Sequence, residues 1–153
     1  MEKLLNDSII QQVEQFFGQL TGRVKLLVFT NAASGESSEV ATSLVGEVAS
    51  LSELISLVVI DMDAKPGLAE QYGVQGKAPA IVIAALDTAE DGSEKITDLG
   101  IRILGVPAGH EFGVLIQDIL MVSTRNSGLG EQTRAYIKTL KEPLHLEVFA
   151  TPG

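Results

Sequence analysis

Residues 28–40 read VFTNAASGESSEV, and this stretch decides how the rest of the chain is interpreted. An apolar, strand-like run ends at Thr30, a loop of small polar residues follows, and a helical pattern begins near Val40. Enzymes often place a nucleophile or a phosphate-binding turn at such a junction. Here the loop offers only alanine, serine, glycine, asparagine and glutamate, so it is either a site or a place where a site has lost its reactive residues.

Composition and charge limit the possible functions. The 153 residues suit one domain with a hydrophobic core, since 45% are hydrophobic and 20% are charged. The net charge of −9 and the absence of a basic run argue against a nucleic-acid partner, because phosphate contacts need clustered lysine and arginine. No apolar run is long enough to span a membrane, and the N-terminus MEKLLNDSII lacks the pattern of a signal peptide. We therefore expect a cytoplasmic protein without membrane contact.

The residue types also exclude some chemistry. The chain contains no cysteine, so it cannot perform thiol chemistry by itself. Neither a P-loop nor a G-x-G-x-x-G motif is present, and we expect no cofactor. Two isolated histidines, His110 and His145, do not make a zinc site. Asp61 and Asp63 end a strand, where paired carboxylates could bind a hard cation, but solvation of the strand end is the favoured interpretation. We expect no metal.

Hydrophobic periodicity predicts alternating strands and helices. The first helix is expected over about 3–20, ended by Thr21-Gly22, and the second over about 40–54, with Ser37 or Ser38 as its N-cap. The apolar strand Leu57–Met62 is expected to be covered on both faces. The other expected elements are the strand Val24–Thr30, the short helix Leu68–Tyr72, the strand over 76–84 with Pro79 near its start, a polar hairpin connection Asp87–Asp98, the strand Leu99–Gly105, and the helix His110–Val122.

This order predicts an α/β fold with a mixed sheet. A helical crossover makes the first two strands parallel, and a tight turn makes the last two antiparallel. A β-α-β unit followed by a β-hairpin and a helix is the thioredoxin-like arrangement.

The C-terminal region looks like the start of a second copy. Residues 131–149 align with residues 11–29 without a gap, helix on helix and strand on strand. Five of the nineteen positions are identical: Gln12/Gln132, Leu20/Leu140, Leu26/Leu146, Val28/Val148 and Phe29/Phe149. Any helix followed by a strand would resemble this pattern, but the ungapped register favours duplication. We therefore expect a thioredoxin-like unit over 1–123, a linker over 124–130, and the truncated start of a second unit over 131–153.

With this order of elements, the chain resembles the first half of the glutaredoxin-like protein disulfide oxidoreductases, which are two fused thioredoxin-like units. The segments that carry the resemblance are VKLLVFT, KAPAIVI, the terminal LHLEVFATP and, above all, GIRILGVPAGHEFGVLIQDILMVS over 100–123. The N-terminal region of the flavoprotein component of alkyl hydroperoxide reductase is a second similar family.

The resemblance implies positions for a redox site, and the sequence departs from them. In the family a Cys-x-x-Cys can follow the first strand, which places it near Gly35 and Ser38, with a shift of one residue possible. Neither residue is a thiol. The chain ends in Thr151-Pro152-Gly153, where the family continues into the cysteine motif of the second unit. No residue is therefore assigned a catalytic role.

The resemblance also implies a role for the proline strand. The Ala78–Pro79 bond is expected to be cis and to face the loop at Gly35 and Ser38, and the backbone at this point is a possible site for an extended peptide substrate. His110, at a helix start, is more simply a capping or packing residue, and His145 is expected to be exposed or covered by the missing unit.

Three functions are compatible with these features. The first is a redox-inactive half of a tandem disulfide oxidoreductase, which serves as a scaffold or positions substrate for a catalytic second half. The second is a stand-alone peptide- or partner-binding domain, and the third is an adaptor domain of a peroxide-reducing system. The expected partners are a protein or peptide substrate, a second thioredoxin-like unit, or a second copy in a homodimer.

Overall fold

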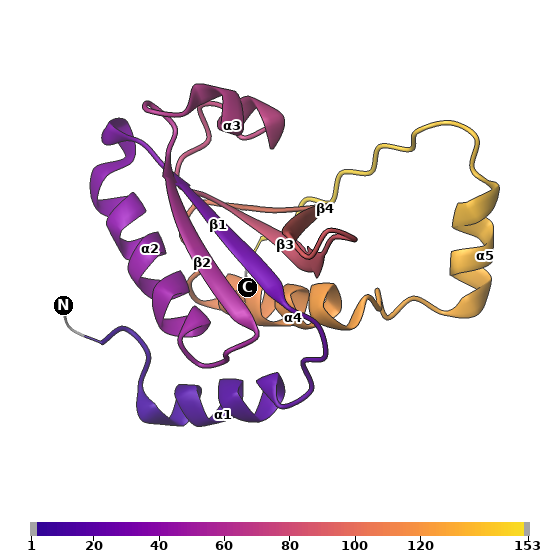
Figure 1. Ribbon diagram of the computed structural model, residues 1–153, viewed down its shortest axis with the longest axis horizontal. Helices are drawn as coiled ribbons and strands as arrows, with labels where there is room; N and C mark the ends of the chain where they lie inside the picture. Colours follow the sequence, from indigo (N-terminus) through magenta and orange to yellow (C-terminus); the bar gives the residue numbers. More distant parts are fainter. Residues whose placement is uncertain (1–2, 152–153) are drawn as a thin grey trace.

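The computed structural model describes residues 3–151, which form a sheet with helices on both faces and a separate C-terminal extension (Figure 1). The four strands are β1 (Val24–Thr30), β2 (Ile55–Asp61), β3 (Ala80–Thr88) and β4 (Glu94–Leu104), in the order β2-β1-β3-β4. β2 runs parallel to β1, whereas β3 is antiparallel to both β1 and β4. The predicted β-α-β unit and hairpin are confirmed.

The two faces of the sheet are covered unequally. On one face, β1 and β3 pack against α1 (Asp7–Phe17), α2 (Gly35–Ala49) and α4 (His110–Thr124) through residues such as Val28, Val45 and Leu115. The other face carries the smaller cluster, which is covered by α3 (Pro66–Gln71) and the residues after it. Figure 1 shows α3 on the side of the sheet away from α1 and α4. Because strand side chains alternate, neighbouring residues of β1 enter different clusters.

The sheet differs from the prediction in the cover of β2 and in the length of the hairpin. β2 is not covered on both faces, because it is an edge strand on which Val58 and Val59 remain 38% and 48% exposed. The expected connection Asp87–Asp98 is mostly strand: β3 reaches Thr88 and β4 begins at Glu94. Polar cross-strand contacts stabilise this part of the hairpin, as in the 2.7 Å hydrogen bond that Thr97 donates to Asp87.

The first helix is shorter than predicted. Asn6 caps α1, since its side chain accepts a hydrogen bond from the backbone N–H of Ile9, and the helix is closed by Gly18 rather than by Thr21-Gly22. The backbone N–H groups of Thr21 and Gly22 both donate to the buried Ser123 hydroxyl at 3.0 Å, which joins this loop to the end of α4.

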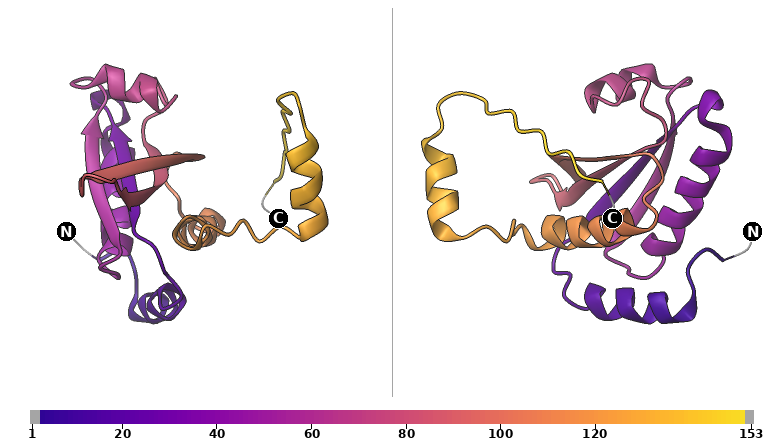
Figure 2. Two further views of the ribbon diagram at one scale, coloured as in Figure 1. Left: turned by 45° about the vertical axis from the view of Figure 1, so that its right-hand side comes forward. Right: turned by 180° about the vertical axis from the view of Figure 1, so that it is seen from behind.

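Up to residue 151, the C-terminal extension contains the helix of the expected repeat but no strand. Helix α5 (Glu131–Thr139) follows a linker over 126–130, and all its residues are exposed. The segment aligned with β1 has no regular structure between residues 143 and 151, and Val148 and Phe149 are each 90% exposed. Figure 2 shows α5 apart from the rest of the molecule in both views. Pro152 and Gly153, where the second cysteine motif was expected to start, lie outside the described residues.

Candidate functional site

The loop after β1 is built by its own polar side chains. Asn31 caps a short 3₁₀ helix, η1 (Ala32–Ser34): its side chain accepts a 2.8 Å hydrogen bond from the backbone N–H of Ser34. In return, the Ser34 hydroxyl accepts from the backbone N–H of Asn31. Because η1 occupies these residues, α2 begins directly at Gly35, and the predicted N-cap at Ser37 or Ser38 is wrong.

The two positions predicted for lost thiols lie in the first turn of α2. Gly35 has a φ of +35°, a backbone conformation that favours glycine, and no side chain to present. Ser38 is buried, at 6% exposure, and its hydroxyl is hydrogen-bonded to that of Ser34. Ser34, which the sequence reasoning missed, is therefore the residue whose side chain meets Ser38.

The proline peptide lies at the same end of the sheet as this loop. The Ala78–Pro79 bond is cis, as the resemblance implied. Phe29 is the register partner of Ala80, so Thr30 and the start of the loop lie beside Pro79. Gly105 donates a 2.8 Å backbone hydrogen bond to the Pro79 carbonyl, which fixes the peptide against the end of β4. The structure thus places Pro79 beside the end of β1, from which the loop with Gly35 and Ser38 leaves the sheet.

The Ala78 backbone is available for a contact. Pro79 is buried and Ala78 is half-buried. Within residues 3–151, no hydrogen bond occupies the N–H or C=O group of Ala78. A free donor and acceptor next to a strand can pair with an extended chain.

The carboxylates of Asp61 and Asp63, at the end of β2, help to hold the loop after β1 in place. Asp63 accepts a 3.0 Å hydrogen bond from the backbone N–H of Ala32, and Asp61 accepts one from the backbone N–H of Asp63. This arrangement ties the end of β2 to the loop after β1. No group of three or more potential metal-binding side chains occurs in the described part of the chain.

The histidines do not join the site. His110 is the first residue of α4 and is exposed, whereas His145 lies in the C-terminal extension and pairs with Glu147 at 2.8 Å. The loop therefore receives no general base from either.

An open hollow of about 500 Å³ lies between α2 and the exposed side of β2. Its lining is polar apart from Ala32, Gly35 and Val59, and Glu39 is its one ionisable residue. The full lining is Thr30, Asn31, Ala32, Gly35, Ser38, Glu39, Thr42, Ser43 and Val59. A hydroxyl is a weak nucleophile without an adjacent base. The hollow can accept hydrogen bonds from a ligand or donate them.

Known proteins have sequences and structures similar to those of this chain. The chain is 31% identical to the NTD_N/C domain of the alkylhydroperoxide reductase AhpF from Enterococcus faecalis, with a TM-score of 0.72 over 87% of this chain and 59% of that one. A protein disulfide oxidoreductase from Aeropyrum pernix has the same TM-score at 21% identity, over 89% of this chain and 55% of that one. The alkyl hydroperoxide reductase AhpF of Staphylococcus epidermidis is 26% identical over 97% of this chain. No family model matches the chain.

The fold and these likenesses define a thioredoxin-like protein. The chain is a homologue of the N-terminal domain of AhpF, and its likeness to the Aeropyrum pernix oxidoreductase supports the same fold. The resemblance found in the sequence is confirmed. The chain spans 24% of the length of the curated AhpF relative. No helix among the described residues has the length and apolar character needed to cross a membrane.

Proposed function

We propose that the chain is a redox-inactive thioredoxin-like unit of a tandem disulfide oxidoreductase, in which it positions a second, catalytic unit. The observation that carries this proposal is the loop after β1, which contains no thiol, in which the Ser38 hydroxyl meets that of Ser34, and which leaves the sheet at the same end as the cis Ala78–Pro79 peptide. Thiol–disulfide exchange needs an attacking thiolate and a second thiol that resolves the mixed disulfide. The sequence contains neither.

The second unit is supported by the C-terminal extension. Helix α5 begins where the aligned repeat expects a helix, and the segment after it exposes Leu144, Leu146 and Val148 at alternate positions. A strand with this pattern is stable only when another part of the protein covers its apolar side. The relatives are longer proteins, and this chain matches only part of each, so they contain further residues that could provide such a cover.

A second candidate function is the binding of an extended peptide or partner. It is favoured by two separate features, the free backbone groups of Ala78 and the polar hollow between α2 and β2. A third candidate is an adaptor in a peroxide-reducing system, which is suggested by the AhpF relatives because they are alkyl hydroperoxide reductases.

An insulin-reduction assay with dithiothreitol tests the proposal. We expect the chain to precipitate insulin no faster than dithiothreitol alone, because no residue can form the mixed disulfide. A thioredoxin with an intact dithiol is the positive control. A rate above background would end the redox-inactive assignment. If the rate stays at background and an extended peptide shifts the amide signals of Ala78 and its neighbours in an NMR titration, the binding function is favoured over the scaffold.

A further inference from the structure

Strand β2 leaves one edge of the sheet open. It is the first strand in the order β2-β1-β3-β4, so within residues 3–151 only β1 pairs with it. Val58 and Val59, which point to opposite faces of the sheet, are 38% and 48% exposed. Val59 also lines the open hollow beside α2, so this helix does not close the edge.

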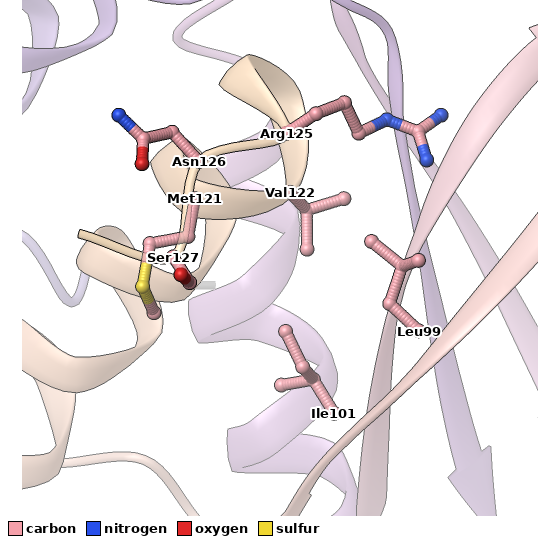
Figure 3. A pocket seen from close by; sticks show the side chains of 7 residues that line it. All are labelled: Leu99, Ile101, Met121, Val122, Arg125, Asn126 and Ser127. Carbon is pink, nitrogen blue, oxygen red and sulfur yellow. The ribbon is translucent and has the colours of Figure 1, made fainter. Parts of the chain in front are cut away.

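The opposite edge, β4, has features that discourage pairing with another strand. A bulge at Leu99 and Gly100 interrupts its register with β3, and a hollow of about 520 Å³ opens beside it toward α4. Figure 3 shows Leu99 and Ile101 of β4 facing Val122 of α4. The charged residues of β4 are Glu94, Lys95, Asp98 and Arg102. Strand β2 has no such protection, because it pairs with β1 without a bulge and its one charged residue is Asp61, at its end.

The ladder between β1 and β2 determines which backbone groups of β2 point outward. Val24 donates its N–H to the Leu54 carbonyl, and Met62 donates its N–H to the Thr30 carbonyl, both at 2.8 Å. The bonding direction alternates from one residue of a strand to the next. The backbone groups of the even-numbered residues over 54–62 therefore point to β1, and those of the odd-numbered residues over 55–61 point away from the sheet.

Some of the outward groups are already bonded, and the rest are free. Ile55 donates its N–H to the Ser52 carbonyl at 3.1 Å, and the Asp61 carbonyl accepts from the N–H of Lys65 at 2.9 Å. Among the described residues, nothing pairs with the N–H and C=O groups of Leu57 and Val59. The C=O group of Ile55 and the N–H group of Asp61 are free as well.

This pattern is self-complementary for two antiparallel strands centred on Val58. Leu57 of one copy then lies opposite Val59 of the other, and the two exchange a pair of backbone hydrogen bonds, which the two-fold symmetry repeats. At each end, the free N–H of Asp61 faces the free C=O of Ile55, and the groups that are already bonded face each other. Every free outward group of β2 thus finds a partner in a second β2.

The side chains fit the same register. Val58 lies on the two-fold axis opposite its own copy, in a pair without direct hydrogen bonds, where β-branched side chains contact each other closely. On the α2 side of the sheet, Val59 lies opposite Leu57, so apolar groups meet on both faces. Asp61 lies opposite Ile55, and no carboxylate of β2 directly faces another.

We propose that two copies of the chain form a dimer through antiparallel β2 strands centred on Val58, which joins their two sheets into one. A second copy is the partner that fits, because the free and the occupied groups of β2 both match those of another β2 in this register. The dimer goes beyond the scaffold function and does not depend on it, since it uses only residues 54–62.

Single cysteines test the register in a chain that has no other thiol. In the Val58→Cys variant, the two Cα atoms would lie about 4.5 Å apart across the axis, within the range that a disulfide can bridge. In the matched control, Ser56→Cys, the two cysteines lie on the same face but roughly 14 Å apart along the strands, because Ser56 is opposite Ile60. Val58→Cys should form the disulfide-linked dimer about tenfold faster on mild oxidation. Equal rates, or no linked dimer from Val58→Cys, would overturn the proposal.

Sedimentation equilibrium tests the dimer without a cross-link. The unmodified chain should associate to dimers as its concentration rises. Val58→Lys sets two ammonium groups opposite each other and should raise the dissociation constant at least about tenfold, whereas Val58→Thr, of similar shape, should change it little. Val59→Pro should also abolish the dimer, because it removes an outward N–H and no hydrogen bond to β1. A chain that stays monomeric, or a dimer that tolerates both Val58→Lys and Val59→Pro, would contradict the pairing.

Amide hydrogen exchange identifies the occupant of the edge. The N–H groups of Leu57 and Val59 should be protected at concentrations where the dimer forms and should exchange rapidly in the monomer. Those of Val58 and Ile60 should be protected in both states, because β1 accepts their hydrogen bonds. If the protection of Leu57 and Val59 does not change with concentration, another segment of the same chain covers the edge, and the proposal fails.

Discussion

Replacing Ser34 and Ser38 together by cysteine should produce a disulfide-forming pair in a protein that has none. The two hydroxyls already contact each other, and residues at this separation on adjoining helical turns fall within the Cα range that a disulfide can bridge. After mild oxidation, titration with a thiol reagent should find no free thiol in the double variant, and reduction should restore both. The result would show that the start of α2 can hold a redox-active pair of thiols at Ser34 and Ser38.

The matched control carries cysteines at Gly35 and Ser38. This pair has the Cys-x-x-Cys spacing predicted from the sequence, but a side chain at Gly35 must adopt a φ of +35°, which costs about 1–2 kcal/mol for an L-residue. We expect this variant to be less stable and to oxidise more slowly. Faster oxidation of the control would mean that the thiol positions of the family correspond to Gly35 and Ser38, and that the contact through Ser34 is incidental.

Phe29→Ala should be the most destabilising single substitution near the site. Phe29 is fully buried at the end of β1, and its ring lies 5.6 Å from that of Tyr72 at a tilted angle. Removing a buried phenylalanine side chain costs about 3–5 kcal/mol, because the surrounding core only partly fills the cavity. Urea denaturation followed by circular dichroism should show this loss in the free energy of unfolding, with the loop over 31–38 affected as well.

The C-terminal segment that aligns with β1 provides a control residue for this prediction. Phe149 aligns with Phe29 in the proposed duplication, but it is 90% exposed, so Phe149→Ala should leave the unfolding midpoint unchanged. A comparable loss in both variants would show that the C-terminal segment packs into a core, contrary to the exposure of its side chains. A small effect of Phe29→Ala would place Phe29 outside the core.

Sequence reasoning predicted the order of the strands and helices because the apolar patterns that define them are local. Strand β1 has the predicted bounds, and the resemblance located the proline strand and the loop after β1. The position of β2 at the sheet edge could not be read from its composition, because an apolar run such as LVVI looks alike at an edge and in the middle of a sheet. Whether a polar segment continues as strand likewise depends on partners far along the chain, as with Asp87 and Thr97.

The candidate site was predicted in part. The resemblance implied that the Ala78–Pro79 bond is cis and faces the loop after β1; the bond is cis, and the register of β1 with β3 places Pro79 beside the end of β1. The capping role of Asn31 was missed, although Asn is a preferred N-cap and Ser34 follows it at the spacing of a reciprocal cap. The hydrogen bond from Ala32 to Asp63 joins residues 31 positions apart, so it depends on how the chain folds and has no local signal in the sequence.

The loop after β1 and the Ala78–Pro79 peptide must lie at one end of the sheet if they form a redox corner without its sulfur. A nuclear Overhauser spectrum of the isotope-labelled chain measures this juxtaposition. We predict cross-peaks between backbone protons of Phe29 or Thr30 and those of Pro79 or Ala80, because Phe29 and Ala80 are register partners. Cross-peaks that instead place Pro79 against α1, with none to Phe29 or Thr30, would contradict the assignment of this corner.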